Sequence, residues 1–556
     1  MIAALSLALE QDDRGEFRRL VGRAGAGDSS ADDQYVCYAG IVGAQDVRTR
    51  AATVEVRGFM IWPIIASLID AMKLNTGFAM RTGATEEIFD LTITGGTVVL
   101  PEGPAKINIG VRQGLIAWMG ADAVKSRSTV DAAGRLVLPG GIDSHCHMDQ
   151  QPWEGRSTAD DFRSGTLSAL CGGNTTVLPF AMQMRGQSLR AIVDDYHERA
   201  RPKAHIDYGF HLIVGDPTPE VLTQELPALI EQGCTSIKLY LTYEGLKLDD
   251  YEVLTILALA RREGVMIMVH AENDACIRWL TDRLLESRKT ALRYHVMAHP
   301  AIGEREAAYR AISFAELIET PILIVHVSSM GVVEEVRRAQ ARGLPIYAET
   351  CPQYLFLSSE DIDTADLSGA KCVCTPPPRE RANQPGMWRG ILDGTLAVFS
   401  SDHSPWNYAD KIAAGPDTPF NKILNGIPGI ETRLPLFFSA TQPNGRLTLN
   451  QFVDITTTTP AKLYGLYPRK GVIAIGSDAD FAIWDPERIV TIRNDMLHHA
   501  VDHTPYEGME VRGWPVVTIS RGEIICEEGR VTSSAGRGRF LRCERPFERK
   551  RDVLTG

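Results

Sequence analysis

Eight apolar runs recur through the middle of the chain, between Gly140 and Pro405, and each is followed by a polar turn and a helix-compatible stretch. They read GGIDSHCHMD, NTTVLPF, DYGFHLIVG, CTSIKLYLT, VMIMVHAEN, PILIVHVSS, LPIYAETCP and LAVFSSDHS. Runs that are continuously apolar, rather than alternating, are typical of parallel strands buried on both faces. Eight strand–helix units are what a (β/α)8 barrel requires. The pattern therefore predicts an α/β fold with a TIM-like barrel over residues 139–467.

The segments on either side of this region alternate apolar and polar positions and are broken by Gly, Pro and Asp. FDLTITGGTVVL and INIGVRQGLIAWMG come before the predicted barrel, and GVIAIGSDADFAIWDPERIVTI and EVRGWPVVTISRGEIICEEGRVT come after it. Short alternating runs between turn residues indicate antiparallel strands. We therefore expect one smaller β-sandwich domain built from both flanks, residues 86–138 and residues 468–535.

The two ends of the chain differ from the rest. Residues 1–85 show no strand–helix rhythm, and we expect an N-terminal extension of unknown structure: an appended lobe, a helical arm or upstream sequence, with Met72 and Met80 as plausible internal starts. Residues 536–556 form a strongly basic tail in an acidic chain. This tail is expected either to be solvated or to pack on a neighbouring subunit through Phe540, Leu541 and Phe547.

Composition narrows the classes of partner. Hydrophobic residues make up 44 % and charged residues 23 % of the chain, which is ordinary for a globular protein. The net charge of −12 argues against nucleic acid or an anionic membrane as a partner. The ten cysteines contain no CxxC pair, and reduced thiols in the cytoplasm fit best. The apolar stretch at residues 58–69 contains a proline and is too short to span a bilayer.

Polar residues close five of the eight predicted strands, at the end where barrel enzymes carry their active sites. Two histidines at positions i and i+2 of a strand share a face, so both rings of the first pair can point into the barrel mouth. The candidate residues are His145, His147, Lys238, His270, His326 and Asp402.

A structural role has to be weighed against each candidate. A single strand histidine is usually a hydrogen-bonded core residue, but four of them on three strand ends, with Asp402 on a fourth, are not independent accidents. Lys238 is costly to bury as an ammonium unless it is paired, for instance with Glu272 or Glu349, or chemically changed. Histidines without such placement are expected to be structural: His197, His205, His295, His498, His499 and His503.

Taken in order and spacing, a set of motifs resembles the cyclic-amidohydrolase branch of the amidohydrolase superfamily, and within it the dihydropyrimidinases and hydantoinases. The motifs are GGIDSHCHMD, IKLYLTYEG, VHAEN, IVHVSS, ETCPQY, CTPPPR, SSDHSPW and NGIPGIETR. The resemblance runs from about Asp90 to about Thr532 and does not cover the first 85 residues.

The resemblance implies a dinuclear metal centre. His145 and His147 would bind the more buried ion with Asp402, and His270 and His326 would bind the more exposed ion. Lys238 would be carboxylated by CO2 to N6-carboxylysine and bridge the two ions. Imidazole and oxygen donors suit two Zn2+ ions per subunit, although Mn2+ or Co2+ could take their place.

The resemblance also implies a reaction. A metal-bridged hydroxide would attack the ring amide of a dihydropyrimidine or 5-substituted hydantoin and give the N-carbamoyl amino acid. Tyr243 would hydrogen-bond the oxyanion, Asp402 would carry the proton to the leaving nitrogen, and Thr375 and Asn425 would hold the substrate. Members of the family are commonly homotetramers, so a homotetramer is expected here.

Three departures from the family pattern bear on the substrate. Thr375 stands where Ser is usual, and its methyl group affects ring fit. Cys146 stands where Thr is usual, and its side chain should point away from the metal side. The first arginine after the His145–His147 pair is Arg156, which favours an uncharged cyclic ureide or imide over dihydroorotate and, less firmly, over allantoin.

Other functions remain open at this point. An allantoinase or a cyclic-imide hydrolase would use the same centre. A catalytically dead oligomeric scaffold, like the collapsin-response-mediator proteins, would lack metal ligands that this chain retains. A mononuclear deaminase of the superfamily would give Lys238 no bridging role.

Overall fold

The computed structural model describes residues 88–150 and 155–550 of the 556-residue chain, which belong to the unit Thr85–Gly556. The N-terminal extension expected for residues 1–85 lies outside the described residues. Among the residues that are described, no helix combines the length and the apolar character needed to cross a membrane.

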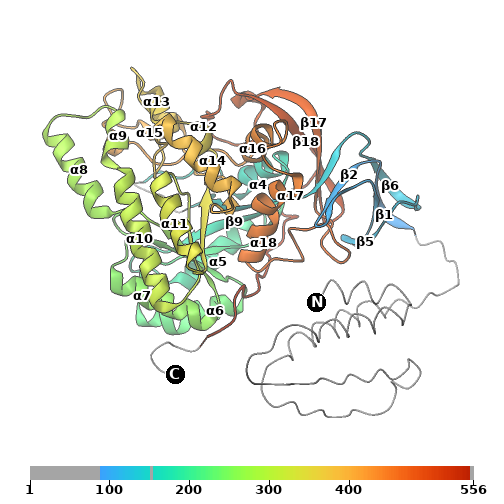
Figure 1. Ribbon diagram of the computed structural model, residues 1–556, viewed down its shortest axis with the longest axis horizontal. Coiled ribbons are helices and arrows are strands. Elements are labelled where there is room, and N and C mark those ends of the chain that lie inside the picture. Colours follow the sequence, from blue (N-terminus) through green and yellow to red (C-terminus); the bar gives the residue numbers. More distant parts are fainter. Residues whose placement is uncertain (1–87, 151–154, 551–556) are drawn as a thin grey trace, which may run out of the picture. The chain divides into compact units, whose positions relative to one another are not determined.

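The eight apolar runs form one curled sheet whose strand pairings are all parallel, which confirms the predicted barrel class (Figure 1). The third run is split into two short strands by Gly209 and Phe210. The strands are β8 (Gly141–Cys146), β9 (Asn174–Met182), β10 (Asp207–Tyr208), β11 (His211–Ile213), β12 (Ser236–Tyr240), β13 (Met266–His270), β14 (Ile322–Ile324), β15 (Ile346–Thr350) and β16 (Val398–Phe399).

The last strand returns to the first through the residues that follow it. The backbone N–H of His147 donates to the carbonyl of His403 over 2.6 Å, and that of Ser401 donates to the carboxylate of Asp143 over 3.1 Å. These bonds join the end of β16 to β8, so the carboxyl ends of the strands meet around one mouth.

Helices stand outside the strands (Figure 1). Between the two layers lies a large apolar core, and a second apolar cluster, which includes Phe180, Met268 and Leu323, fills the barrel interior. The α-helices are α4 (Phe162–Cys171), α5 (Leu189–Ala200), α6 (Leu226–Glu231), α7 (Asp250–Glu263), α8 (Asp274–Glu286), α9 (Arg293–Ala298), α10 (Ala301–Ile318), α11 (Met330–Ala341), α12 (Gln353–Phe356), α13 (Ser359–Ile362), α14 (Gln384–Leu392), α15 (Tyr408–Lys411), α16 (Arg433–Thr441), α17 (Leu449–Val453) and α18 (Thr459–Leu463).

Helix α7 shows how the sequence sets these boundaries. The carboxylate of Asp249 accepts the backbone N–H of Glu252, and the side chain of Glu252 accepts the N–H of Asp249, which makes a capping box. Gly264 ends the helix in the left-handed region with φ 69°, where a glycine carries no steric cost. Shorter 3-10 and π turns are η1 (Val221–Glu225), η2 (Leu367–Cys372), η3 (Arg381–Asn383), η4 (Phe420–Lys422), η5 (Asp454–Thr458) and η6 (Asn494–Met496).

The flanks form two sheets around a shared core. One sheet has the strand order β5-β4-β1-β6 and the other β20-β19-β18-β17-β7-β2-β3, so strands from both chain ends share the second and meet where β17 pairs with β7. In Figure 1 the blue strands of the N-terminal flank lie beside the red strands of the C-terminal flank. The strands are β1 (Phe89–Thr94), β2 (Thr97–Leu100), β3 (Gly103–Ala105), β4 (Asn108–Arg112), β5 (Leu115–Gly120), β6 (Ser126–Asp131), β7 (Leu136–Pro139), β17 (Phe481–Thr491), β18 (Glu510–Ser520), β19 (Glu523–Glu527) and β20 (Arg530–Val531).

The prediction that these strands are all antiparallel was wrong for two pairs. Strand β1 pairs with β6, and β2 pairs with β7, in parallel. Alternating polarity reports that one face of a strand is buried, but it carries no information on strand direction. The long returns between these partners, which contain the β4–β5 hairpin, make the parallel pairing possible.

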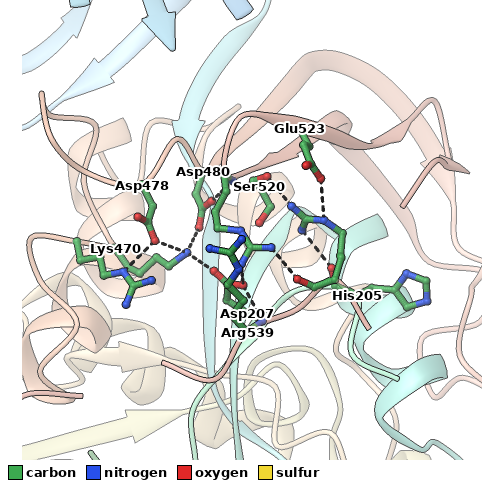
Figure 2. Close-up of polar contacts among 11 residues, drawn as sticks. His205, Asp207, Lys470, Asp478, Asp480, Ser520, Glu523 and Arg539 are labelled. Atoms are coloured by element: carbon green, nitrogen blue, oxygen red, sulfur yellow. Dashed lines mark hydrogen bonds and ion pairs between the residues drawn. The ribbon is translucent and has the colours of Figure 1, made fainter. Parts of the chain in front are cut away.

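A buried lysine ties the barrel to the β-sandwich. The Nζ atom of Lys470 lies 2.8 Å from Asp207 at the start of a barrel strand, 2.9 Å from Asp478 and 2.6 Å from Asp480. Figure 2 shows its side chain directed at all three carboxylates. Burial lowers the pKa of Lys470, but the three carboxylates outweigh burial and hold the pKa above its ordinary value. The ammonium is therefore retained and joins the two parts of the fold.

The basic tail, as far as residue 550, packs on its own chain (dark red in Figure 1). The N–H of Leu541 donates to the carbonyl of Tyr208 over 2.7 Å, and the N–H of Phe547 donates to the carbonyl of Gly264 over 3.2 Å. Leu541 is fully buried in the barrel-interior cluster. The expectation of a solvated tail was wrong over residues 536–550, because the amino-terminal ends of the barrel strands offer backbone groups and an apolar surface to the segment. Packing of this segment on a neighbouring subunit stays a prediction.

Candidate active site

The six predicted ligands come together at the mouth of the barrel. His145 lies in β8 with His147 just beyond it, Lys238 lies in β12, and His270 ends β13. His326 and Asp402 follow β14 and β16. The ring centroids of His145 and His326 are 5.4 Å apart, and those of His270 and His326 are 4.5 Å apart.

Three of these side chains direct their donor atoms at one point. The Oδ1 atom of Asp402 lies 3.2 Å from Nε2 of His145 and 3.4 Å from Nε2 of His147. The three donor atoms lie within 4.8 Å of one another, and all three residues are buried. Two imidazoles and a carboxylate at this spacing are a donor set that suits Zn2+. A divalent metal fits here.

The ionisation of these groups favours metal binding. Burial, and next to it the positive charge of Lys238, holds the pKa of His145 well below its usual value, so its ring is neutral with a lone pair to donate. Burial raises the pKa of Asp402, but His145 and His147 outweigh it and keep the pKa below its ordinary value. Asp402 is therefore an anion at neutral pH.

The amine of Lys238 is buried and has no hydrogen-bond partner among the described residues. The ion pair considered with Glu272 or Glu349 is not formed; Nζ instead lies 5.2 Å from the ring centres of Phe180 and Tyr240. Burial lowers the pKa of Lys238 to about 8. A pKa near 8 lets a part of this amine be neutral at physiological pH, and an amine with unused donors close to five other donor side chains fits a lysine that becomes a carbamate and so an oxygen ligand.

Two glutamates contact a ring nitrogen of two of the proposed ligands, His145 and His270, and so orient their rings. The Oε1 atom of Glu349 lies 2.6 Å from Nδ1 of His145, and Oε2 of Glu272 lies 2.9 Å from Nε2 of His270. Carboxylates that bind the second ring nitrogen fix the tautomer and direction of a metal-binding histidine. The sequence identified both glutamates only as possible partners of Lys238. The sequence did contain a sign that both glutamates orient histidines, because each lies near the carboxyl end of a barrel strand.

A cavity of about 290 Å³ opens beside the six ligands. The three predicted substrate-binding residues Tyr243, Thr375 and Asn425 line it, with Tyr243 beside Thr375. Burial raises the pKa of Tyr243 well above its usual value, so the phenol remains a hydrogen-bond donor. Apolar side chains complete the wall: Met182, Leu246, Trp406, Ile423 and Leu424. A small ring with an apolar substituent fits this lining.

The model of the amidohydrolase family matches residues 136–525. The chain belongs to the amidohydrolase family. A D-hydantoinase of Rhizobium radiobacter is 40 % identical over 452 residues, which cover 81 % of this chain and 98 % of the relative. A D-hydantoinase of Geobacillus stearothermophilus is 40 % identical over 453 residues, covering 81 % and 96 %. The crystal structure of a dihydropyrimidinase from Brevibacillus agri NCHU1002 aligns with a TM-score of 0.80 at 38 % identity, over 83 % of this chain and 99 % of that one.

Three of the nine described non-glycine residues with positive φ line the cavity of this amidohydrolase. Tyr243, His326 and Asp402 have positive φ values of 74°, 38° and 49°. The left-handed region costs a bulky side chain about 1–3 kcal/mol, and such residues cluster where function needs an unusual direction. Here, the unusual direction turns the three side chains toward one cavity at the ends of their strands.

A further lysine of this amidohydrolase, which the sequence did not reveal, holds the substrate wall in place. Lys411 is fully buried, and its Nζ donates to the carbonyls of Val373, Leu424 and Gly426 over 3.0, 2.8 and 2.6 Å. These carbonyls belong to the two segments that carry Thr375 and Asn425. One ammonium with three acceptors therefore fixes the distance between them.

Most other residues lie where the sequence predicted. Cys146 is buried on the helix side of β8, away from the metal-side rings of its neighbours. None of the six histidines expected to be structural lines the described cavity. The segment at residues 421–426 forms much of the wall, yet only Asn425 was predicted from it.

Proposed function

We propose that this amidohydrolase opens the ring amide of a cyclic ureide or imide by metal-dependent hydrolysis, with a dihydropyrimidine or a 5-substituted hydantoin as substrate and the N-carbamoyl amino acid as product. The observation that carries the proposal is the amine of Lys238, which is buried without a hydrogen-bond partner among the described residues and lies near His145, His270, His326 and Asp402. The D-hydantoinases and the dihydropyrimidinase that the chain resembles support this class of substrate.

The proposed centre holds two Zn2+ ions per subunit, with Mn2+ or Co2+ as compatible replacements. His145, His147 and Asp402 would hold one ion, His270 and His326 the other, and a carbamate on Lys238 would bridge them. Two such cations, when bound, polarise a carbonyl and lower the pKa of water toward neutrality.

The chain's own residues then do three things. The carboxylate of Asp402 is an anion at the mouth and can take a proton at Oδ1 and return it to the departing ring nitrogen. The phenol of Tyr243 donates a hydrogen bond to the oxygen on which charge develops. Thr375 and Asn425 hold the amide of the ring, and the carbonyl oxygen Oδ1 of Asn425 is buried with no partner among the described residues.

A scaffold without activity is disfavoured, because all six donor side chains are present and five of them line the cavity at the mouth. Allantoin and cyclic imides would use the same groups. We further propose a homotetramer in the cytoplasm. The nine cysteines that the structure describes are free thiols, which supports a reducing compartment.

A substrate panel tests this proposal. The full chain, with its metal content measured, is offered dihydrouracil, the two enantiomers of a 5-phenylhydantoin, allantoin and succinimide, and products are identified by mass spectrometry. Ring-opened hydantoin or dihydrouracil is the expected product, and Asp402→Asn should abolish it. Turnover of allantoin or succinimide alone would change the substrate class, and metal-loaded protein that hydrolyses none of these compounds would contradict the proposal.

A further inference from the structure

A second group of metal-binding side chains gathers away from the mouth, where the barrel meets the β-sandwich. Cys171 ends α4, Glu431 lies just before α16, His498 lies between β17 and β18, and Cys526 lies in β19. The donor atoms of Cys171, Glu431 and His498 lie within 4.8 Å of one another, and Sγ of Cys526 lies 3.8 Å from Sγ of Cys171. None of the four residues takes part in the proposed catalytic site.

The sulfur separation matches a tetrahedral metal edge. With Zn–S bonds of about 2.3 Å, two thiolates at tetrahedral angles lie about 3.8 Å apart. A disulfide would need its sulfurs at about 2.05 Å. Two thiols in hydrogen-bond contact would have a similar spacing, so the sulfur pair alone does not identify a metal site.

The ring of His498 is held with one nitrogen facing the cluster. Its Nε2 lies 3.1 Å from the carbonyl oxygen of Gly529, which can only accept, so Nε2 carries a proton. Its Nδ1 lies 2.9 Å from Oε1 of Glu431. A neutral ring would direct its lone pair at a carboxylate oxygen, so this contact requires either a second proton on the ring or a cation between the two groups.

The remaining atoms of these ligands already have partners. Oε2 of Glu431 accepts the hydroxyl of Ser168 over 2.9 Å and the backbone N–H of His498 over 2.8 Å. The other two donor atoms, Oε1 of Glu431 and Nδ1 of His498, face each other over 2.9 Å beside Sγ of Cys171. Outer partners that fix the far side of each ligand are a feature of built metal sites.

We propose that Cys171, Cys526, His498 and Glu431 bind one structural Zn2+ ion that fastens the barrel to the β-sandwich. Two thiolates, an imidazole and a carboxylate complete a four-coordinate shell with no open position, which is the arrangement of a structural and not a catalytic zinc site. Binding releases the protons of the two thiols and any proton on Nδ1 of His498. Cys171, Cys526 and Glu431 are at most 4 % exposed, and the side chain of His498, which is 27 % exposed, forms the outer side of the site.

Cobalt substitution tests the site independently of the proposed reaction. Co2+ bound to thiolates gives an intense near-ultraviolet charge-transfer absorption, and none of the proposed catalytic ligands is a cysteine. Full-length protein loaded with Co2+ should show this absorption. Cys171→Ser/Cys526→Ser should lose it together with one metal equivalent per subunit, whereas the control Cys276→Ser, on α8, should keep both.

Single variants keep the test valid if the double variant does not fold. Cys526→Ser should lose roughly half of the charge-transfer intensity, and His498→Gln should keep both sulfurs but bind Co2+ at least about tenfold more weakly. Wild-type protein that carries Co2+ without the absorption would overturn the proposal. So would a Cys171–Cys526 disulfide in the freshly purified protein, detected by peptide mass without reduction.

Discussion

Nδ1 of His145 and Oε1 of Glu349 lie 2.6 Å apart inside the barrel, and the same oxygen accepts the backbone N–H of His326 over 3.1 Å. One buried carboxylate oxygen therefore orients two proposed metal ligands that belong to different ions. Glu349 touches no cavity wall, so its role is to position the ligands.

Glu349→Gln should weaken metal retention by about tenfold or more, since the hydrogen bond that orients the ring of His145 is altered. The measurement is the rate at which bound Zn2+ passes to a chromogenic chelator. The control is Glu360→Gln, a substitution of an exposed glutamate on α13. Equal rates for Glu349→Gln and the wild type would show that the hydrogen bond to His145 is not needed to hold the ions.

Lys238→Ala should lose most of the bound metal and nearly all activity, because the proposed bridging anion disappears. Acetate or propionate added with the metal should restore part of the turnover by occupying the vacated space. Lys106→Ala, on the surface of the β-sandwich, is the control. A Lys238→Ala protein with its full metal content and normal turnover would refute the carbamate.

The capture of CO2 by metal-free protein should depend on pH. Burial lowers the pKa of Lys238 to about 8, and carboxylation needs the neutral amine. At a fixed concentration of dissolved CO2 and excess Zn2+, the rate at which activity returns should rise with pH up to about 8 and then level off. A recovery rate that does not change across this range would contradict the assignment of the pKa.

Tyr243→Phe should keep the metals and the KM but lower kcat by roughly a hundredfold or more, the usual cost of losing one donor to an oxyanion. Tyr251→Phe, at a position that is 80 % exposed, should behave as the wild type. An unchanged kcat for Tyr243→Phe would assign this tyrosine to packing alone.

Lys411→Met should raise KM more than it lowers kcat, because the two segments that carry Thr375 and Asn425 lose their common donor. Three buried carbonyls would be left without this partner, at about 1–3 kcal/mol for each one that finds no other, so the apparent Tm should also fall. Lys422→Met, at an exposed position in the same wall, separates the loss of a charge from the loss of the buried bonds. If Lys411→Met lowers Tm without changing KM, the lysine serves only the fold.

The barrel and its ligand ends could be predicted from the sequence because continuous apolar runs and the polar residue that closes each one are local features. The parallel pairing of β1 and β2 with their partners could not be predicted, since the alternation of apolar and polar residues is the same in parallel and antiparallel strands. The partner of His145 could not either, because Glu349 is 204 residues away in the chain. The buried position of Leu541 and the three hydrogen bonds of Lys411 could not be predicted for the same reason, because they depend on segments that meet only in the folded chain.

The pairing of β7 with β17 also limits when the β-sandwich can fold during synthesis on the ribosome. Val137 pairs with Ile483, which is made only after 346 further residues of the chain. At ordinary rates of translation this takes roughly 20–70 s. During that time the apolar faces of β2 and β7 have no C-terminal strand to cover them, so binding by a chaperone should be strongest at Val98, Val137 and their neighbours and should end when β17 emerges.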